Sequence, residues 1–164
     1  MGALLKSHHK VFLVIATGVL VVDQVTKAVV SSSLKMYESR QIIPGFLNLI
    51  RVHNTGAAFG LLAGETSPGR TFFFLTVSFL ALGVVLWMLL RLLPEQKMEL
   101  VALSLIFGGA LGNVIDRARL GEVVDFIDVY YRSHHWPAFN VADSAITLGV
   151  ILLLWRLLFA PDSD

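Results

Sequence analysis

The sequence predicts an α-helical polytopic membrane protein with four transmembrane helices, and two observations lead to this fold class. Hydrophobic residues make up 55% of the 164 residues and charged residues only 15%, whereas soluble domains contain roughly 25% charged residues. Four segments are each long and apolar enough to cross the roughly 30 Å hydrocarbon core of a bilayer. So few charges cannot build the polar surface that a soluble domain of this size needs.

The four spans divide the chain into a single membrane domain, residues 1–164, with two long loops. The second span is the clearest because it contains no charged residue and is bracketed by Arg70 and Arg91. The spans are expected at about residues 11–30, 71–90, 98–116 and 141–159. The loops are expected at residues 31–70 and 117–138.

The first span has an alternative interpretation as a cleavable signal peptide. Basic residues at 6–10 precede an apolar run that begins at Val11, which is the order found in signal peptides. No A-x-A cleavage site follows, although the serines at 31–33 are small, and the apolar pattern continues past Asp23 and Lys27. A retained helix with a functional end is therefore preferred.

The two long loops differ in their predicted structure. Residues 46–52 alternate between apolar and polar side chains, which is typical of a short strand. We therefore expect β-structure lying against the membrane surface in the first loop. In the second loop, residues 122–131 are predicted as a short amphipathic helix, with a strand as the alternative.

An even number of spans places both termini on one side of the membrane and both long loops on the other. The side with the long loops has more Lys and Arg residues in total, but the terminal side has the higher density of them. Because Lys and Arg are enriched in short cytoplasmic segments, the termini are predicted to be cytoplasmic.

Polar residues gather at the ends of the spans on the face that bears the long loops. Ionisable groups near the bilayer are costly, so several at one depth predict a functional site. Taken singly, each has a plainer explanation: Asp116 pairs with Arg117, or Asn140 or Asp143 caps the last helix. The residues of this group are Asp23, Lys27, Asn113, Asp116, Arg117, Asn140 and Asp143.

Composition excludes several kinds of chemistry. The chain has no cysteine, which rules out disulfides, thiol catalysis and cysteine-bound metals, and its net charge of +1 without a basic stripe argues against nucleic acid. No histidine lies within a span, and His53, His134 and His135 occur in loops without metal-ligand spacing. We expect neither a metal nor another cofactor.

Aspartate remains as the reactive residue type, and a pair of aspartates has a specific use. Two neighbouring carboxylates cannot both ionise, so one keeps a proton while the other draws a proton from water. Such a pair hydrolyses amides without a metal. Asp125 in the second long loop and Asp143 at the start of the last span lie on the same face, so the topology allows them to meet.

Glycine spacing adds two weaker signals. Gly108 and Gly112 form a small-xxx-small pattern, which usually allows helices to pack closely. The segment Asn54–Phe59 is either an ordinary turn or a loop that contacts a substrate.

Five short motifs then occur in order along the chain: DQVTK (23–27), NTGAAFG (54–60), GGALGNVIDR (108–117), VVDF (123–126) and FNVADSA (139–145). Their sequences and order resemble those of the lipoprotein signal peptidases, the signal peptidase II family. The motifs cover residues 23–145, and the four-helix layout covers the whole chain.

This resemblance implies an aspartic endopeptidase of the bacterial inner membrane that cleaves diacylglyceryl-modified prolipoproteins just before the lipidated Cys. It implies cytoplasmic termini, a site near the extracytoplasmic face, an extracytoplasmic β-cradle in the 40–62 region and a short helical loop over the site. By motif, the catalytic dyad is Asp125 and Asp143. The implied substrate-binding residues are Asp23, Lys27, Asn54, Gly56, Asn113, Asp116, Arg117, Asn140 and Ala142.

The expected partners are therefore the diacylglyceryl-prolipoprotein and membrane lipid, and a monomer suffices. Asp23 and Lys27 are interpreted as shaping the site or facing lipid headgroups, rather than as catalytic. A proton-coupled transporter would instead place carboxylates at the bilayer midplane and show repeat symmetry, neither of which is seen. A purely structural subunit would tolerate Asp125→Asn together with Asp143→Asn.

Overall fold

The computed structural model describes residues 2–56, 64 and 67–159, with side chains from His8 onward. Within these residues, four helices are long and apolar enough to span a membrane, which confirms the predicted fold class. The helices are α1 (Gly2–Ser33), α2 (Pro68–Arg91), α3 (Lys97–Leu120) and α4 (Val141–Phe159). The strands are β1 (Ser39–Ile43), β2 (Leu47–Asn54), β3 (Val123–Tyr131) and β4 (His134–His135).

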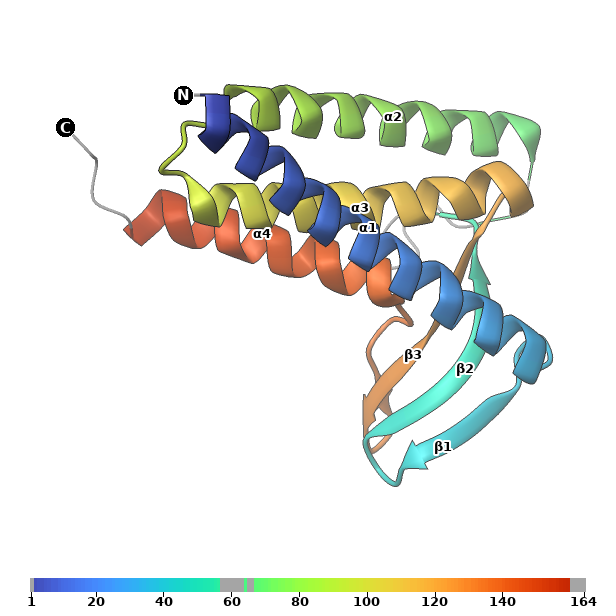
Figure 1. Ribbon diagram of the computed structural model, residues 1–164. Coiled ribbons are helices and arrows are strands. Elements are labelled where there is room, and N and C mark those ends of the chain that lie inside the picture. Colours follow the sequence, from blue (N-terminus) through green and yellow to red (C-terminus); the bar gives the residue numbers. More distant parts are fainter. Residues whose placement is uncertain (1, 57–63, 65–66, 160–164) are drawn as a thin grey trace.

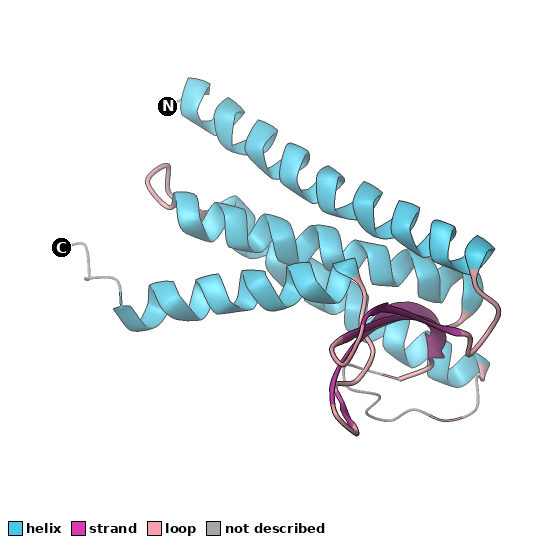
Figure 2. Ribbon diagram, turned by 90° about the horizontal axis from the view of Figure 1, so that it is seen from below, coloured by secondary structure: helices cyan, strands magenta, loops and turns pink. Residues whose placement is uncertain are grey.

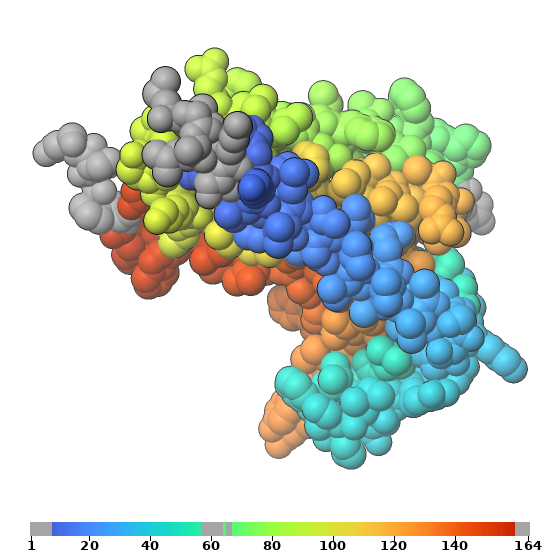
Figure 3. All heavy atoms as spheres, in the orientation of Figure 1, coloured from blue at the N-terminus to red at the C-terminus, as the bar shows by residue number. Residues whose placement is uncertain are grey.

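The helices pack as a bundle, with α1 crossing in front of α3 in Figure 1, and the sheet projects from one end of the bundle (Figures 1 and 3). α3 is central and contacts α1, α2 and α4. α1 begins and α4 ends at the end of the bundle opposite the sheet (Figure 1). This arrangement agrees with the expectation that both long loops share one side of the membrane.

Apolar side chains on the outside of the helices are strongly exposed, as a lipid-facing surface requires. Val14, Leu80 and Leu157 have exposed fractions of 72%, 67% and 78%. A water-soluble protein rarely exposes a continuous surface of this kind. The buried positions instead face α3, where glycines let the helices approach.

Gly108 and Gly109 on α3 explain this close packing. A Cβ atom at Gly108 would lie 2.6 Å from the carbonyl oxygen of Ala16 on α1, and one at Gly109 would lie 2.5 Å from that of Ala142 on α4. Both distances are shorter than any van der Waals contact allows. The packing role predicted from the glycine spacing is therefore confirmed, and it fixes α1 and α4 against α3.

The four strands form one antiparallel sheet in the order β1-β2-β3-β4, which curves at one end of the helices (Figure 2). β2 is paired with β3 so that Val52 lies opposite Asp125, with an irregular register between Leu49 and Val52. On the other face of β3, the buried Phe126 packs against Val30 and Leu34 of the α1 end.

The prediction of a helix at residues 122–131 is wrong, because this segment forms β3. Its β-branched and aromatic side chains suit a strand that is buried on both faces, and pairing with β2 satisfies its backbone. Residues 122–131 therefore do not supply the short helical loop that the resemblance implied. The predicted β-structure of the first loop is confirmed at 39–54, and residues 57–63 of that region lie outside the described residues.

Helix boundaries also differ from the expectation. α3 continues to Leu120 and ends at Gly121, which adopts φ 78° as a left-handed cap. Asp116 and Arg117 thus lie within a helix rather than where a loop begins. α1 ends where Arg51 of β2 donates from Nη1 to the carbonyl oxygens of Ser31 (2.8 Å) and Leu34 (3.1 Å), so β2 terminates α1.

Candidate active site

The two aspartates that the sequence singled out come together at the junction of sheet and helices, and Asn140 joins them. Asn140 is fully buried and donates from Nδ2 to Asp125 Oδ1 at 2.7 Å. Its Oδ1 accepts from the backbone N of Asp143 at 2.9 Å, and its own backbone N donates to Asp143 Oδ2 at 3.3 Å. Asn140 thus caps α4 reciprocally with Asp143 and also holds Asp125.

Two further amides complete the surroundings of these carboxylates. Asn54 at the end of β2 donates to Asp125 Oδ2 at 3.1 Å. Asn113 of α3 donates to Asp143 Oδ1 at 2.8 Å. Each oxygen of Asp125 and Asp143 therefore accepts one hydrogen bond from an asparagine, and both carboxyl groups have fixed orientations.

Asp125 lies outside the membrane spans and is almost completely buried. Burial, followed by the repulsion from Asp143, raises the pKa of Asp125 to about 7. The hydrogen bonds from Asn54 and Asn140 and the charge of Lys27 act in the opposite direction. Asp125 therefore retains its proton at pH values where an exposed aspartate has lost it.

A buried ion network lies behind the carboxylates. Lys27 Nζ is 2.9 Å from Asp23 Oδ2 and 2.9 Å from Asp116 Oδ2, and it donates to Asn113 Oδ1 at 2.9 Å. Lys27 has an exposed fraction of 3% and Asp23 of 0%. Their burial agrees with a role in shaping the site and not with contact to lipid headgroups, and Asp116 pairs with Lys27 rather than with Arg117.

The same network holds the backbone next to each aspartate. Asp23 Oδ1 accepts from the N of Ala142, one residue before Asp143, at 2.9 Å. Asp116 Oδ2 accepts from the N of Val124, one residue before Asp125, at 3.2 Å. Asp23 and Asp116 thus position the two chain segments that carry the aspartates.

Gln24 also belongs to this network, although it is not among the site residues predicted from the sequence. Its Nε2 lies 3.0 Å from Asp116 Oδ1 and 3.2 Å from both Asp23 Oδ2 and the carbonyl oxygen of Gly112. The signal for such a role was present in the sequence, because Gln24 is a polar residue between Asp23 and Lys27 in an otherwise apolar span.

Arg117 connects the site to the loop after β2. Its Nη2 donates to the carbonyl oxygen of Gly56 at 2.9 Å, and its guanidinium lies 5.4 Å from the ring centroid of Phe74. The backbone N of Gly56 in turn donates to Asn54 Oδ1 at 2.9 Å. Arg117 therefore holds the start of the loop after β2, and through Gly56 it also supports Asn54.

A cavity of about 610 Å³ begins at this cluster and extends between α2 and α4. Asn54, Asn113, Arg117 and Asp143 line its polar end. Asp125 is buried directly behind Asn54. The remaining wall is mostly apolar and consists of Phe74, Val77, Ser78, Val123, Trp136, Pro137, Ala138, Phe139, Ser144, Ile146, Thr147, Leu148 and Ile151.

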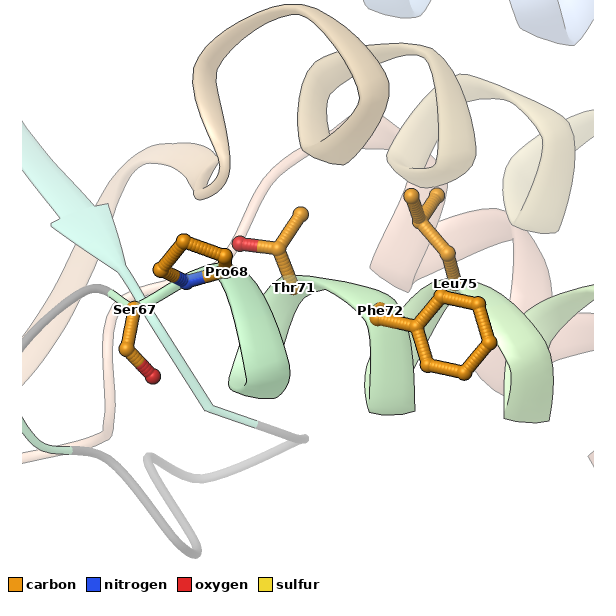
Figure 4. Close-up of a pocket in the computed structure, with 5 residues that line it drawn as sticks. All are labelled: Ser67, Pro68, Thr71, Phe72 and Leu75. Carbon is orange, nitrogen blue, oxygen red and sulfur yellow. The ribbon is translucent and has the colours of Figure 1, made fainter.

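A second hollow of about 440 Å³ lies at the start of α2 (Figure 4). It is lined by Ser67, Pro68, Thr71, Phe72 and Leu75. None of these residues is ionisable, and none belongs to the polar cluster. This hollow therefore offers no chemistry for a reaction.

The loop histidines lie apart from this cluster. His135 Nδ1 is 2.8 Å from Asp128 Oδ1, and its ring stacks on Tyr130. His53 Nδ1 is 3.7 Å from Glu122 Oε2. Among the described residues, no group of three or more His, Asp or Glu side chains is arranged to hold a metal ion.

Comparison with known proteins decides the family. The model of the signal peptidase (SPase) II family matches residues 15–159. The chain belongs to the signal peptidase II family. The resemblance found in its five motifs is thereby confirmed, and the chain is a peptidase of this family and a multi-pass bacterial membrane protein.

Individual members of the signal peptidase II family cover nearly the whole chain. The lipoprotein signal peptidase of Desulforapulum autotrophicum is 46% identical, over 92% of this chain and 93% of that protein. That of Geobacter sulfurreducens is 47% identical, over 91% and 92%. A solved bacterial membrane enzyme structure, determined by the in meso method at 2.3 Å, has a TM-score of 0.81 at 37% identity and covers 94% of each chain.

Proposed function

We propose that this peptidase removes the signal peptide from diacylglyceryl-modified bacterial prolipoproteins by cleaving just before the lipidated Cys, with Asp125 and Asp143 as an aspartic dyad. The observation that carries the proposal is that Asn140 links two carboxyl groups: Asp143, which lines the polar end of the cavity between α2 and α4, and the buried Asp125. The lipoprotein signal peptidases of other bacteria supply the substrate class.

The dyad works with one shared proton. We assign this proton to Asp125, whose burial raises its pKa to about 7, and the role of base to Asp143, which lines the cavity. Asp143 takes a proton from a water molecule as the water attacks the carbonyl carbon that precedes the lipidated Cys. Asp125 protonates the carbonyl oxygen, which gives a tetrahedral gem-diol. Asp143 then gives its proton to the leaving amine as the C–N bond breaks, and Asp125 takes a proton back from one hydroxyl as the carboxylic acid forms.

The other site residues bind substrate or hold the dyad. Asn54, Asn113 and Asn140 orient the carboxyl groups, while Arg117 and the Gly56 carbonyl lie where the substrate backbone enters. Asp23, Lys27, Asp116 and Ala142 keep the two aspartate-bearing segments in place. The signal peptide occupies the groove between α2 and α4, and the acyl chains remain in lipid.

The site faces the extracytoplasmic side, and the termini are cytoplasmic. The density of Lys and Arg on the terminal side supports this orientation. The carboxylates gather at one end of the bundle rather than at its centre, which argues against a proton-coupled transporter. A structural subunit would have no use for two carboxyl groups that one asparagine links, one of them buried and the other lining a cavity.

The test uses purified protein in detergent with a diacylglyceryl-modified prolipoprotein and the same prolipoprotein without the lipid. We expect cleavage of the modified substrate only, with mass spectrometry placing the cut between the lipidated Cys and the residue before it. Equal cleavage of both substrates, or a cut elsewhere, would contradict the proposed specificity. No cleavage of either would contradict the function itself.

A further inference from the structure

The groove between α2 and α4 contains two hydroxyl groups beyond its polar end. Ser78 lines it from α2 and Thr147 from α4. Their neighbours along the walls are the apolar Val77, Ile146 and Leu148. These two positions therefore supply polar atoms within an apolar part of the groove.

Both hydroxyl-bearing residues lie at the same depth. Ser78 follows Phe74 by four residues, and the Phe74 ring contacts the Arg117 guanidinium. Thr147 follows Asp143 by four residues. Residues four apart on a helix share a face and are separated by about one turn, roughly 5.4 Å. Ser78 and Thr147 are therefore each one turn further into the groove than the polar site.

Neither hydroxyl is used by its own helix. Serine and threonine within helices commonly donate to the carbonyl four residues earlier, as Thr76 does to Phe72 (2.8 Å) and Ser144 does to Asn140 (2.9 Å). Within the described residues, Ser78 and Thr147 make no such hydrogen bond to Phe74 or Asp143. Both hydroxyls are thus available to a molecule in the groove.

The substrate needs such groups at this depth. Water can attack the scissile carbonyl only if the peptide leaves the helical conformation there, and unwinding frees the backbone N–H and C=O groups of the adjoining residues. Within the hydrocarbon region, no water replaces those hydrogen bonds. A hydroxyl can both donate to a carbonyl and accept from an N–H group.

We infer that Ser78 and Thr147 are substrate-positioning residues that hydrogen-bond the unwound backbone of the signal peptide beside the scissile bond. The inference rests on the proposed function, because it assigns the occupant of the groove. It explains how the unwound segment of a helical signal peptide is stabilised in the membrane. Ser78 and Thr147 bind the peptide backbone and do not contact the dyad. The contacts are to the backbone, so they accept substrates with different side chains.

The test compares Ser78→Ala, Thr147→Val and the double variant in the cleavage assay with the diacylglyceryl-modified prolipoprotein. Each single variant leaves one substrate backbone group without a partner, so we expect kcat/KM to fall by about tenfold. The double variant should show a larger fall in kcat/KM. The thermal unfolding temperature of all three variants should equal that of the wild type. Thr147→Ser restores most of the loss because it restores the hydroxyl. Thr76→Val, on the exposed side of α2, is the matched control and retains wild-type kcat/KM.

The outcomes separate this inference from the function on which it rests. A double variant that cleaves as fast as the active wild type would overturn the inference and leave the proposed function intact. An equal fall in kcat/KM for Thr76→Val would also overturn the inference, because removing any hydroxyl from α2 would then have the same effect, whether or not it lines the groove. A wild type that does not cleave would overturn both.

Discussion

At the scale of single residues, the site depends on asparagine amides that fix the carboxyl groups. An amide has both a donor and an acceptor, so Asn140 can hold Asp125 with its nitrogen and cap Asp143 with its oxygen. An aspartate at position 140 could not donate to Asp125 and would add a further negative charge beside the dyad. Asn113 likewise receives from Lys27 and donates to Asp143.

The raised pKa of Asp125 predicts the pH dependence of cleavage. In the mechanism that we propose, the active dyad carries one proton, which Asp125 loses as pH rises through about 7. We therefore expect kcat/KM to fall by about tenfold per pH unit above that value. Asn54→Ala removes a hydrogen bond that favours the charged form, so the fall should shift to higher pH. Asn48→Ala is the control, because Asn48 lies in the same strand but bonds Asp128; its pH profile of kcat/KM should equal that of the wild type. A shift of the Asn54→Ala profile to lower pH would refute the assignment of this pKa to Asp125.

Lys27 is predicted to be essential for stability because it is the cation between two buried carboxylates. Lys27→Met keeps much of the side-chain volume but leaves Asp23 and Asp116 without the positive charge of Lys27. Removing one partner of a buried ion pair costs about 3–5 kcal/mol, so thermal unfolding in detergent should begin at a clearly lower temperature. Lys35→Met, at an exposed lysine after α1, should unfold like the wild type. Equal unfolding temperatures for the two variants would contradict the role given to Lys27.

At the scale of elements, the dyad needs α3 and α4 at the distance that glycine allows. Gly109→Ala places a Cβ atom 2.5 Å from the Ala142 carbonyl oxygen and 2.9 Å from Ile146 Cγ1. α4 must then move away from α3, which stretches the bond between Asn113 and Asp143. We expect a loss of about 1–3 kcal/mol in stability and at least tenfold in kcat/KM. Gly83→Ala on α2 is the control, because a Cβ atom there meets nothing within 4 Å, and it should keep wild-type stability and kcat/KM. Wild-type activity in Gly109→Ala would show that the spacing of α3 and α4 is not critical.

Some elements could be predicted from the sequence and others could not. Hydropathy alone locates the spans, because lipid requires long apolar helices. For residues 122–131 a helix is predicted ahead of the strand alternative, because apolar and polar side chains do not alternate regularly there. Both faces of β3 are buried, one against α1 and one against the site, so regular alternation is not required. Its identity as a strand depends on pairing with β2, some seventy residues earlier in the sequence, and local propensity does not contain that information.

The candidate site shows the same limit. The convergence of intramembrane polar residues at one end of the bundle could be predicted from the spans. The meeting of Asp125 and Asp143 was only allowed by topology, and the motif resemblance was needed to choose that pair. Gln24 and the bridging geometry of Asn140 follow from how α1, α3 and α4 pack, which no spacing in the sequence reveals.

At the scale of the whole molecule, we expect the sheet to lie on the extracytoplasmic side of the membrane. The chain has no cysteine, so a single introduced thiol reports its own position. Tyr37→Cys, exposed beside the sheet, should react with a membrane-impermeant thiol reagent in intact cells whose outer surface is accessible. Leu93→Cys, exposed in the turn at the opposite end, should react only after lysis. The reverse pattern would contradict the proposed orientation.

We propose that Asp125 and Asp143 together perform the hydrolysis, and variants that remove each carboxylate test this. Cleavage of a diacylglyceryl-modified prolipoprotein is followed with a chelator present for the wild type, Asp125→Asn, Asp143→Asn and Asp128→Asn. Asp128 is the matched control, because it is a buried carboxylate of the same strand that bonds His135 and Asn48 instead. We predict that both dyad variants bind the substrate but lose at least about a thousandfold in kcat, while the wild type and Asp128→Asn cleave. Near-normal turnover by either dyad variant would contradict the claim.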